Sequence, residues 1–540
     1  MAALDDAQAW RDQDPDDVTR AELDALIASG DEATLAARFA ARLEFGTAGL
    51  RGELGAGPTR MNRVLVAQAA AGLANYLLDT IGAPSVVIGY DGRTNSQVFA
   101  RDTAEIMAGA GIRAILLPRL LPTPVLAFAV RHLDVSAGVM VTASHNPARD
   151  NGYKVYLGGL DHGSQIVPPA DGLIAAQIEK VAAGDIRSLP RSTSYETAGE
   201  DVLDAYVAAT AALGDTAIAA PRFVYTAMHG VGWETAKRVF ADAGLGTPIV
   251  VQQQIEPDAA FPTVAFPNPE EPGALDLAIA LAAAEGADLV VANDPDADRL
   301  AIAIPTANGW RRLSGNEVGL VLGWEAGLTN REGTFAASIV SSPGLREIAR
   351  KFGLDYVDTL TGFKWISRAG GLVYGFEEAL GYLVDPAKVR DKDGISAAVV
   401  FLRLAASLAA QGTTIADHLA ALDEKFGAYA SSQISLRVDD LADIPRLMHR
   451  VRAQLPSHIG SVAIESIDDF SQGFGGFGPS DILRFWLADS ARVIVRPSGT
   501  EPKLKVYIDA SSTDGSATER RAAAEATVAE LDRGMRELLG

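Results

Sequence analysis

The 540-residue sequence contains no cysteine, so the chain forms no disulfide and no thiol-based metal or catalytic site. It also lacks a long apolar run: stretches such as residues 397–410 are too short for a membrane span or are broken by charges. Residues 1–17 are acidic and lack the basic and apolar segments of a signal peptide. These absences predict a cytoplasmic protein with no membrane partner.

Positive charge is scarce, with 47 Lys and Arg against 69 Asp and Glu, a formal net charge of −22. Such a chain is a poor partner for nucleic acid or an anionic membrane surface. The five histidines other than His145 and His229 show no ligand spacing with one another, which argues against a zinc site. The length suggests three or four domains, and the hydrophobic content of 48% is typical of globular proteins.

The segment 141–147 places one serine, Ser144, directly after the apolar, strand-like run 137–141. A turn follows, and Pro147 stands where it could open a helix, because proline is tolerated at the first helical position. A hydroxyl held forward at such a turn, beside free backbone N–H groups, suits a serine that carries a phosphoryl group. The alternative is a serine that only caps a helix or closes the turn.

The segment 293–299 carries three alternating carboxylates between two strand-like runs, 287–292 and 300–305. Carboxylates this close repel one another unless a cation neutralises them, and oxygen ligands favour Mg²⁺ over a soft metal. An EF-hand loop is excluded, because Arg299 and Pro305 stand where it needs Gly and Glu. A solvated acidic turn is the remaining alternative. Arg299 could clamp a phosphate or carboxylate.

Two later loops have weaker signals. Residues 375–382 hold adjacent glutamates between glycines, which suits either paired sugar hydroxyls or an acidic surface turn. Residues 496–503 combine arginine, two hydroxyls and a glycine between two strand-like runs, a composition that suits phosphate binding but also a plain turn.

Taken together, these four motifs resemble those of the α-D-phosphohexomutases, which include phosphoglucomutase and phosphomannomutase. They occur in the family's order, and the resemblance extends to residues 45–52, 89–93, 150–154 and 361–364. The long segment before Arg51 and the glutamate loop are similar to the branch that contains bacterial phosphoglucomutases and animal phosphopentomutase-like enzymes.

The resemblance implies that a phosphorylated Ser144 donates its group to a sugar monophosphate and regains one from the resulting bisphosphate. It implies one Mg²⁺ per chain, on Asp294, Asp296, Asp298 and Ser144, and a sugar bisphosphate as activator. Arg51, His145 and Lys154 complete the expected catalytic set, with Lys154 either handling a proton or acting as a fixed cation. Expected substrate-binding residues are Arg299, Thr361, Gly362, Glu377, Ala379, Arg496, Ser498, Gly499, Thr500 and Lys505.

A net-negative protein that binds sugar phosphates needs a locally positive site. The candidate cations are Arg51, Arg93, Lys154, Arg299, Arg496 and Lys505.

The order of strand-like and helical segments predicts an α/β fold: three similar mixed α/β domains, a smaller α+β C-terminal domain, and an active site in the central cleft. We expect domain I at residues 1–203 with the phosphoserine loop and domain II at 204–309 with the Asp loop. Domain III is expected at 310–427 with the Glu loop, and domain IV at 428–540 with the phosphate-binding loop.

The preferred sugar stays open, with glucose, mannose, glucosamine and ribose phosphates as candidates, as does a monomeric or dimeric state. Many members of the family have serine where this chain has Ala379, which puts hexose specificity in doubt. Alternatives are a phosphopentomutase, a sugar-1,6-bisphosphate synthase, a phosphatase with Asp294 as nucleophile, and a non-catalytic sugar-phosphate-binding protein.

Overall fold

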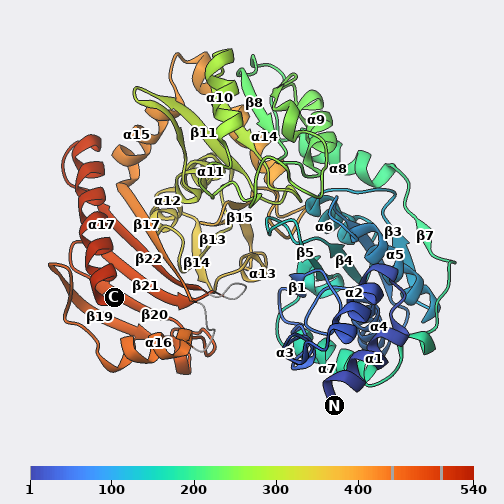
Figure 1. Cartoon of the computed structure of the whole chain (residues 1–540). Coiled ribbons are helices and arrows are strands. Elements are labelled where there is room, and N and C mark those ends of the chain that lie inside the picture. Colours follow the sequence, from blue (N-terminus) through green and yellow to red (C-terminus); the bar gives the residue numbers. More distant parts are fainter. Residues whose placement is uncertain (1, 439–442, 499–502, 540) are drawn as a thin grey trace. The chain divides into compact units, whose positions relative to one another are not determined.

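The computed structural model describes residues 2–438, 443–498 and 503–539, so the predictions for Gly499 and Thr500 lie outside the described residues (Figure 1). The chain divides into two compact units. The first contains Met1–Leu313, Phe363–Arg368 and Leu380–Ala410. The second contains Ser314–Gly362, Ala369–Ala379 and Gln411–Gly540.

The first unit begins with helices α1 (Ala2–Gln13), α2 (Asp17–Ser29) and α3 (Glu32–Phe39). Asp16 caps α2 by accepting a hydrogen bond from the Val18 N–H, and Gly30 ends it in the left-handed conformation that glycine adopts without strain. Apolar residues of these helices, including Trp10 and Leu23, pack in one buried cluster with α4 (Arg63–Thr80).

The first sheet has the strand order β1-β5-β4-β2-β3-β7, with β6 paired to β5. Strands β2, β3, β4 and β7 pair in parallel, whereas β5 is antiparallel to both β4 and β1. Strand β4 is buried along its whole length, as expected for a parallel strand covered on both faces. The strands are β1 (Leu50–Glu53), β2 (Ser85–Tyr90), β3 (Arg113–Leu116), β4 (Ala137–Val141), β5 (Asp150–Leu157), β6 (Ser164–Gln165) and β7 (Glu196–Thr197).

Besides α4, four helices and two short 3-10 turns lie in the chain between the strands of the first sheet and before the second sheet. They are α5 (Ser96–Gly109), α6 (Thr123–His132), α7 (Ala170–Ala182) and α8 (Asp201–Ala211), with the short 3-10 turns η1 (Gly159–Asp161) and η2 (Ile186–Ser188).

The second sheet has the order β12-β11-β10-β8-β9, and the third has the order β14-β13-β15-β16. The second comprises β8 (Phe223–Thr226), β9 (Ile249–Val250), β10 (Leu289–Ala292), β11 (Ala301–Thr306) and β12 (Gly309–Arg312). The third comprises β13 (Thr334–Ser338), β14 (Asp355–Thr359), β15 (Leu372–Glu377) and β16 (Gly381–Leu383). Their helices and 3-10 turn are α9 (Gly232–Asp242), η3 (Gln252–Gln254), α10 (Asp276–Glu285), α11 (Gly315–Thr329), α12 (Gly344–Phe352), α13 (Phe363–Ile366), α14 (Gly394–Ala410) and α15 (Ile415–Phe426).

The first three sheets repeat one arrangement, which confirms the expectation of three similar domains. In each sheet, four strands follow one another along the chain and lie side by side in the spatial order fourth, third, first, second. These sets are β5-β4-β2-β3, β11-β10-β8-β9 and β16-β15-β13-β14. The turn between the third and fourth strands carries a sequence motif every time. Ser144 follows β4, the three aspartates follow β10, and Glu378 follows β15.

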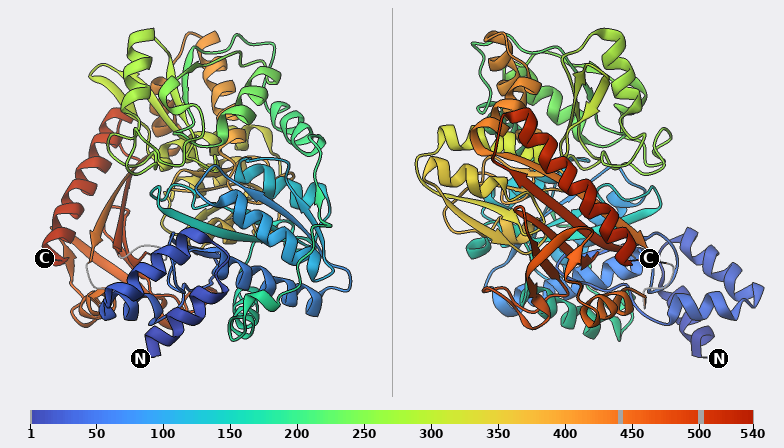
Figure 2. Two further views of the ribbon diagram at one scale, coloured as in Figure 1. Left: turned by 45° about the vertical axis from the view of Figure 1, so that its right-hand side comes forward. Right: turned by 90° about the vertical axis from the view of Figure 1, so that its left-hand side faces the viewer.

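The last domain is a sheet of order β17-β22-β21-β20-β19-β18, antiparallel throughout the pairings between these neighbours. Figures 1 and 2 show α17 (Ala517–Leu539) lying along this sheet, where it buries Leu531 and Met535. The other elements are β17 (Ala428–Arg437), α16 (Asp443–Ala453), β18 (His458–Ile459), β19 (Val462–Asp469), η4 (Phe470–Gln472), β20 (Leu483–Leu487), β21 (Ala491–Pro497) and β22 (Lys503–Ser512). The α+β prediction for this domain is therefore confirmed.

The prediction that Pro147 opens a helix is wrong. The Asp150 N–H donates to the Pro147 carbonyl, and the chain reverses through a turn into β5, where Lys154 pairs with Met140 of β4. The reversal leaves no room for a helical turn between the two antiparallel strands.

Among the described residues no single helix is both long and apolar enough to cross a membrane. By length and composition alone, the bent pair α14 and α15 passes the same test together.

Candidate active site

Ser144 occupies a tight turn at the end of β4 and is 3% exposed. Its φ of +52° lies in the left-handed region that non-glycine residues seldom adopt. The Thr142 hydroxyl accepts a hydrogen bond from its N–H at 2.8 Å, and its own Oγ donates to Asp294 Oδ2 at 2.9 Å. His145 Nδ1 lies 3.1 Å from the same Oγ. The turn thus aims the hydroxyl at the aspartate loop of the neighbouring domain.

The aspartate loop follows β10 and buries Asp294, Asp296 and Asp298 completely. One carboxylate oxygen from each can be chosen so that all three lie within 4.8 Å of one another. Ala297 takes a positive φ of +55°, which lets alternate aspartates converge. Gly230 permits the neighbouring turn to approach this loop, because a Cβ there would lie 2.2 Å from the Pro295 Cα.

Two lysines neutralise part of this acidic cluster. Lys154 Nζ lies 2.8 Å from Asp296 Oδ2 and 2.9 Å from Asp298 Oδ2. Lys392 Nζ lies 3.0 Å from the same Asp298 oxygen. Lys154 was expected here from the sequence, whereas Lys392 was missed. The sequence feature that could have indicated Lys392 is its position between two acidic residues, Asp391 and Asp393.

Buried contacts hold the segment that carries Lys392. Asp391 Oδ2 accepts hydrogen bonds from the Tyr156 hydroxyl at 2.9 Å and from Gln165 Nε2 at 2.8 Å. The Tyr206 hydroxyl donates to Asp393, which also accepts from the first backbone N–H groups of α14. The flanking aspartates therefore anchor the segment while the lysine between them faces the cluster.

The three carboxyls differ in their electrostatic environment. Burial, with Asp296 and Asp298, raises the pKa of Asp294 well above its ordinary value. Burial and Asp298 also disfavour charge on Asp296, but Lys154 and the Thr123 hydroxyl outweigh them and lower its pKa. Burial opposes charge on Asp298, yet Lys154 and its neighbouring cations lower its pKa as well. The carboxyl nearest Ser144 is thus the one whose charge is least supported by the protein.

The donor set fits a hard divalent cation. In the described part of the chain, Oδ1 of Asp296 and Oδ1 of Asp298 are buried and have no hydrogen-bond partner. Buried carboxylate oxygens without partners are costly, and carboxylate oxygens are the ligands that Mg²⁺ prefers. Asp294, Asp296 and Asp298 are therefore the residues that could hold the ion, beside the Ser144 hydroxyl.

Two arginines bring positive charge to this cluster. Arg51 Nη1 donates to Asn146 Oδ1 at 3.3 Å. Arg299 donates its backbone N–H to Asp294 Oδ1 at 2.9 Å, and the charge of its guanidinium, which lies 3.8 Å from Glu270, helps to lower the pKa of Asp298. Burial, followed by Arg299 and Arg51, lowers the pKa of His145 well below its ordinary value. His145 is consequently neutral near pH 7 and faces the Ser144 hydroxyl as an uncharged ring.

Arg93 was also expected to supply positive charge to a ligand. Its guanidinium instead donates to main-chain carbonyls of the Ser144 turn, so its donors are directed at the protein.

The other expected site residues belong to the second unit. Thr361 and Gly362 follow β14, and Glu377 ends β15 with Ala379 two positions later. The adjacent Glu378 is held by two hydroxyls, from Ser338 Oγ at 3.2 Å and Ser341 Oγ at 3.0 Å. The serine hydroxyls fix the position of Glu378 in this loop, a contact that the sequence alone did not reveal.

In the last domain, Arg496 of β21 pairs in register with Lys505 of β22, and both are partly exposed. Like charges directly opposite each other on a sheet are destabilising unless an anion lies between them. The Ser498 N–H donates to the Lys503 carbonyl at 2.8 Å, which closes the base of the expected phosphate loop.

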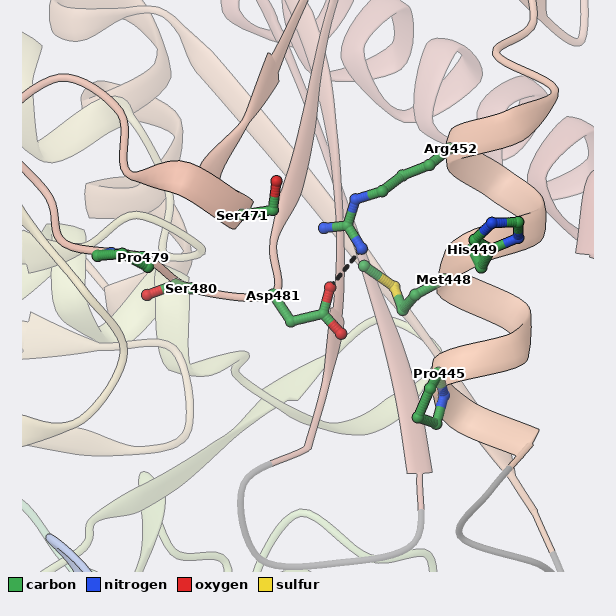
Figure 3. A pocket seen from close by; sticks show the side chains of 8 residues that line it. All are labelled: Pro445, Met448, His449, Arg452, Ser471, Pro479, Ser480 and Asp481. Carbon is green, nitrogen blue, oxygen red and sulfur yellow. Dashed lines mark hydrogen bonds and ion pairs between the residues drawn. The ribbon is translucent and has the colours of Figure 1, made fainter.

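The last domain also contains an open groove of about 450 Å³ beside α16 (Figure 3). Side chains of α16, among them Met448 and His449, line one wall, and Ser471, Ser480 and Asp481 line the other. Arg452 in this groove pairs with Asp481 at 2.6 Å and with Asp469 at 3.1 Å. Two carboxylates already neutralise the arginine, so the groove does not have the electrostatics of a phosphate site.

Four family models match the chain in succession. They describe phosphoglucomutase/phosphomannomutase alpha/beta/alpha domain I at residues 42–185, domain II at 204–309, domain III at 314–426 and the C-terminal domain at 434–528.

Individual proteins resemble the chain over nearly their full length. A Haemophilus influenzae protein named "Probable phosphomannomutase" is 55% identical over 89% of this chain and 98% of its own. The phosphopentomutase of Mus musculus is 36% identical over 95% of this chain and 91% of its own. A phosphoglucomutase/phosphomannomutase family protein from Burkholderia thailandensis has the same fold, with a TM-score of 0.70 at 21% identity, over 92% of this chain and 97% of that one.

Proposed function

Since the chain belongs to the phosphoglucomutase/phosphomannomutase family and is a phospho-sugar mutase, we propose that it moves a phosphoryl group between C1 and C6 of a hexose phosphate. The substrate is a glucose or mannose phosphate, and the reaction passes through a phosphoserine enzyme and a sugar bisphosphate. The relative at 55% identity, named for mannose, supports the choice of a hexose.

One observation carries the proposal: the Ser144 hydroxyl lies 2.9 Å from Asp294, at the edge of a buried triad with two unpartnered carboxylate oxygens. A serine that only closed a turn would have no need of this setting. Phosphoryl transfer depends mainly on positioning and on neutralising charge, and both are provided at this hydroxyl.

In the first step, the P–O bond to Ser144 breaks while a bond forms between phosphorus and a sugar hydroxyl oxygen. The proton of that hydroxyl is transferred to the departing Ser144 oxygen, which becomes a free hydroxyl. After the bisphosphate turns end for end, its other phosphoryl group returns to Ser144. Arg51, Lys154 and Arg299 surround this position and offset the negative charge of the transferring group. The neutral His145 ring orients the serine hydroxyl through Nδ1.

Lys154 is assigned as a fixed cation in this scheme. Burial opposes its charge, but Asp296 and Asp298 outweigh burial and raise its pKa. A lysine that stays protonated stabilises charge and is a poor base. Lys154→Arg should then keep part of the activity, whereas a residue that must exchange a proton would not tolerate this change.

Mg²⁺ bound by Asp294, Asp296, Asp298 and an oxygen of phosphorylated Ser144 would neutralise the charge of the transferring phosphoryl group. We assign the sugar hydroxyls to Glu377, with Thr361, Gly362 and Ala379 as the other sugar-binding positions. We assign the phosphate that is not reacting to Arg496, Ser498 and Lys505, with Gly499 and Thr500. A sugar bisphosphate is the activator, since it can transfer a phosphoryl group back to a Ser144 that has lost its own.

The test is intact-mass measurement of the purified chain before and after incubation with glucose 1,6-bisphosphate. We expect the mass of one phosphoryl group on the wild type, mapped to Ser144, and none on Ser144→Ala. Turnover of that variant should fall by at least about a thousandfold. Ser188→Ala, at an exposed serine of the first domain, is the control and should behave like the wild type. Phosphate on Asp294 instead would favour a phosphatase, and normal turnover of Ser144→Ala would refute the scheme.

A pentose phosphate is the second candidate substrate. The relative named phosphopentomutase is 36% identical, and Ala379 lacks the serine that many members of the family have. Coupled assays with glucose, mannose, glucosamine and ribose 1-phosphates decide between them. A higher kcat/KM for ribose 1-phosphate would replace the hexose proposal and leave the serine chemistry in place.

A further inference from the structure

Arg93 lies shortly after β2, and its buried guanidinium is directed into the turn that carries Ser144. Nη2 donates to the carbonyls of Ser144 and Asn146, both at 2.6 Å. Nη1 donates to the carbonyls of Pro147 at 2.8 Å and Asp150 at 3.1 Å. One side chain thus binds four backbone carbonyls, which extend from the serine itself to the first residue of β5.

The turn needs this support because its conformation is unfavourable. A non-glycine residue at a φ near that of Ser144 costs on the order of 1 kcal/mol and persists only where its surroundings hold it. The guanidinium also supplies donors to the carbonyls of this partly buried turn, where an unpaired carbonyl would be costly. The planar guanidinium presents several N–H donors in fixed directions, which a lysine ammonium does not.

Arg93 is itself held on its other sides. Asp91 Oδ2 lies 3.4 Å from Nε, and the Phe261 ring lies below the guanidinium with its centroid 4.9 Å away. Asp91 Oδ1 accepts hydrogen bonds from the Arg93 backbone N–H at 3.0 Å and from the Ser96 hydroxyl at 2.6 Å. The arginine is therefore fixed by the domain and in turn fixes the turn.

We propose that Arg93 is a positioning residue for phosphoryl transfer: it holds the Ser144 turn so that the serine oxygen faces the aspartate loop. It acts through the backbone and contributes no contact to substrate. The inference rests on the proposed function, in which Ser144 carries the phosphoryl group. Small displacements of a reacting atom slow a reaction strongly while leaving distant substrate contacts intact.

The test compares Arg93→Lys with Arg63→Lys. The control removes a comparable guanidinium, which donates to both oxygens of Asp102 at 2.7 and 2.8 Å in the same domain but does not touch the turn. We expect kcat of Arg93→Lys to fall about ten- to a hundredfold with KM changed less than roughly threefold. Rephosphorylation of Ser144 by glucose 1,6-bisphosphate, followed by intact mass, should slow in proportion. Arg63→Lys should keep the kcat and the rephosphorylation rate of the wild type.

Hydrogen exchange of the wild type provides a measurement that does not depend on the variant's folding. The N–H groups of Asn146 and Asp150 should exchange as slowly as those of β4. In Arg93→Lys these two should exchange faster while the β4 amides remain protected.

The outcomes separate the inference from the proposed function. A wild type that never carries phosphate on Ser144 would overturn both. A wild type that is phosphorylated, alongside a folded Arg93→Lys with unchanged kcat, would overturn the positioning role alone. Rapid exchange of the wild-type turn would do the same, as would a change confined to KM, which would make Arg93 a substrate contact.

Discussion

Buried charges are arranged differently in the Ser144 cluster and in the sheet of the last domain. In that sheet, Arg492 and Asp509 face each other on β21 and β22, with Nε and Oδ2 2.9 Å apart. The other Asp509 oxygen accepts a hydrogen bond from the Ser431 hydroxyl at 2.7 Å. In the aspartate loop, by contrast, Asp296 and Asp298 each keep a buried oxygen with no partner in the described structure.

The difference separates structural charges from those that await a ligand. A buried pair whose hydrogen bonds are complete needs nothing further, and removing one partner strands the other. A cluster whose buried carboxylate oxygens have no partner is completed by an added cation. Burial raises the pKa of both Asp294 and Asp509, so incomplete pairing, and not burial, distinguishes the aspartate loop.

The largest effect on stability is expected from breaking the complete pair. Arg492→Met leaves Asp509 buried without its cation and should lower the free energy of unfolding of the last domain by about 3–5 kcal/mol. Arg533→Met is the matched control, because Arg533 is largely exposed and pairs with Glu530 within one helix; it should cost less than about 0.5 kcal/mol. Urea unfolding followed by hydrogen exchange in β21 and β22 measures both. Equal losses in the two variants would contradict the structural role.

Arg496 lies four residues from Arg492 on the same strand but faces Lys505 instead of a carboxylate. A pair of like charges has no structural value without an anion, so Arg496→Ala should leave stability nearly unchanged. It should raise KM about ten- to a hundredfold for every accepted sugar phosphate, through loss of a charge-assisted hydrogen bond. Steady-state kinetics across the sugar panel measures this effect. Unchanged KM values together with a lower Tm would assign Arg496 to the fold.

His418 provides a third case beside the Arg492–Asp509 pair and the aspartate cluster. It is a buried ionisable group that packs against an aromatic ring and lies near a cation. It stacks on Trp324 at 4.2 Å, and burial with the nearby Lys425 lowers its pKa to about 4. The unfolded chain binds its proton near pH 6.5 and the folded chain only near pH 4, so stability should fall as the pH drops through this window. The loss at pH 4 should be about 3 kcal/mol. His418→Phe, compared by urea unfolding from pH 7 to 4, should remove this component; an identical pH profile would disprove it.

Only a small effect on stability is expected at the incomplete cluster. Asp294→Asn resembles the protonated carboxyl that burial already favours, so the metal-free protein should change by less than about 1 kcal/mol. Mg²⁺ affinity should fall at least about tenfold, because one negative ligand is lost. Calorimetric Mg²⁺ titration and metal-free unfolding give the two values. A large loss of metal-free stability would place Asp294 with Asp509 among the structural charges.

Much of the site was predictable from local sequence. Ser144 and the three aspartates stand directly after strand-like runs, and the runs 85–90 and 137–141 coincide with β2 and β4. The error at Pro147 has a physical cause: its fixed φ suits both a first helical turn and a tight reversal. Only the antiparallel pairing of β5 with β4, a contact between separate segments, selected the reversal.

The sequence by itself determined the motifs, their order, the α/β class and the absence of thiol chemistry, because strand propensity, turn chemistry and ligand type are local properties. The tertiary structure decided which groups meet. In the folded chain Lys392 forms an ion pair with Asp298, and the Arg93 guanidinium donates to the Ser144 turn. Glu378 accepts hydrogen bonds from two serine hydroxyls. The tertiary structure also gave the first three sheets the same strand order, so that each motif follows the third of the four shared strands in its domain. Such pairings depend on packing between distant segments, and no local pattern in the chain encodes them.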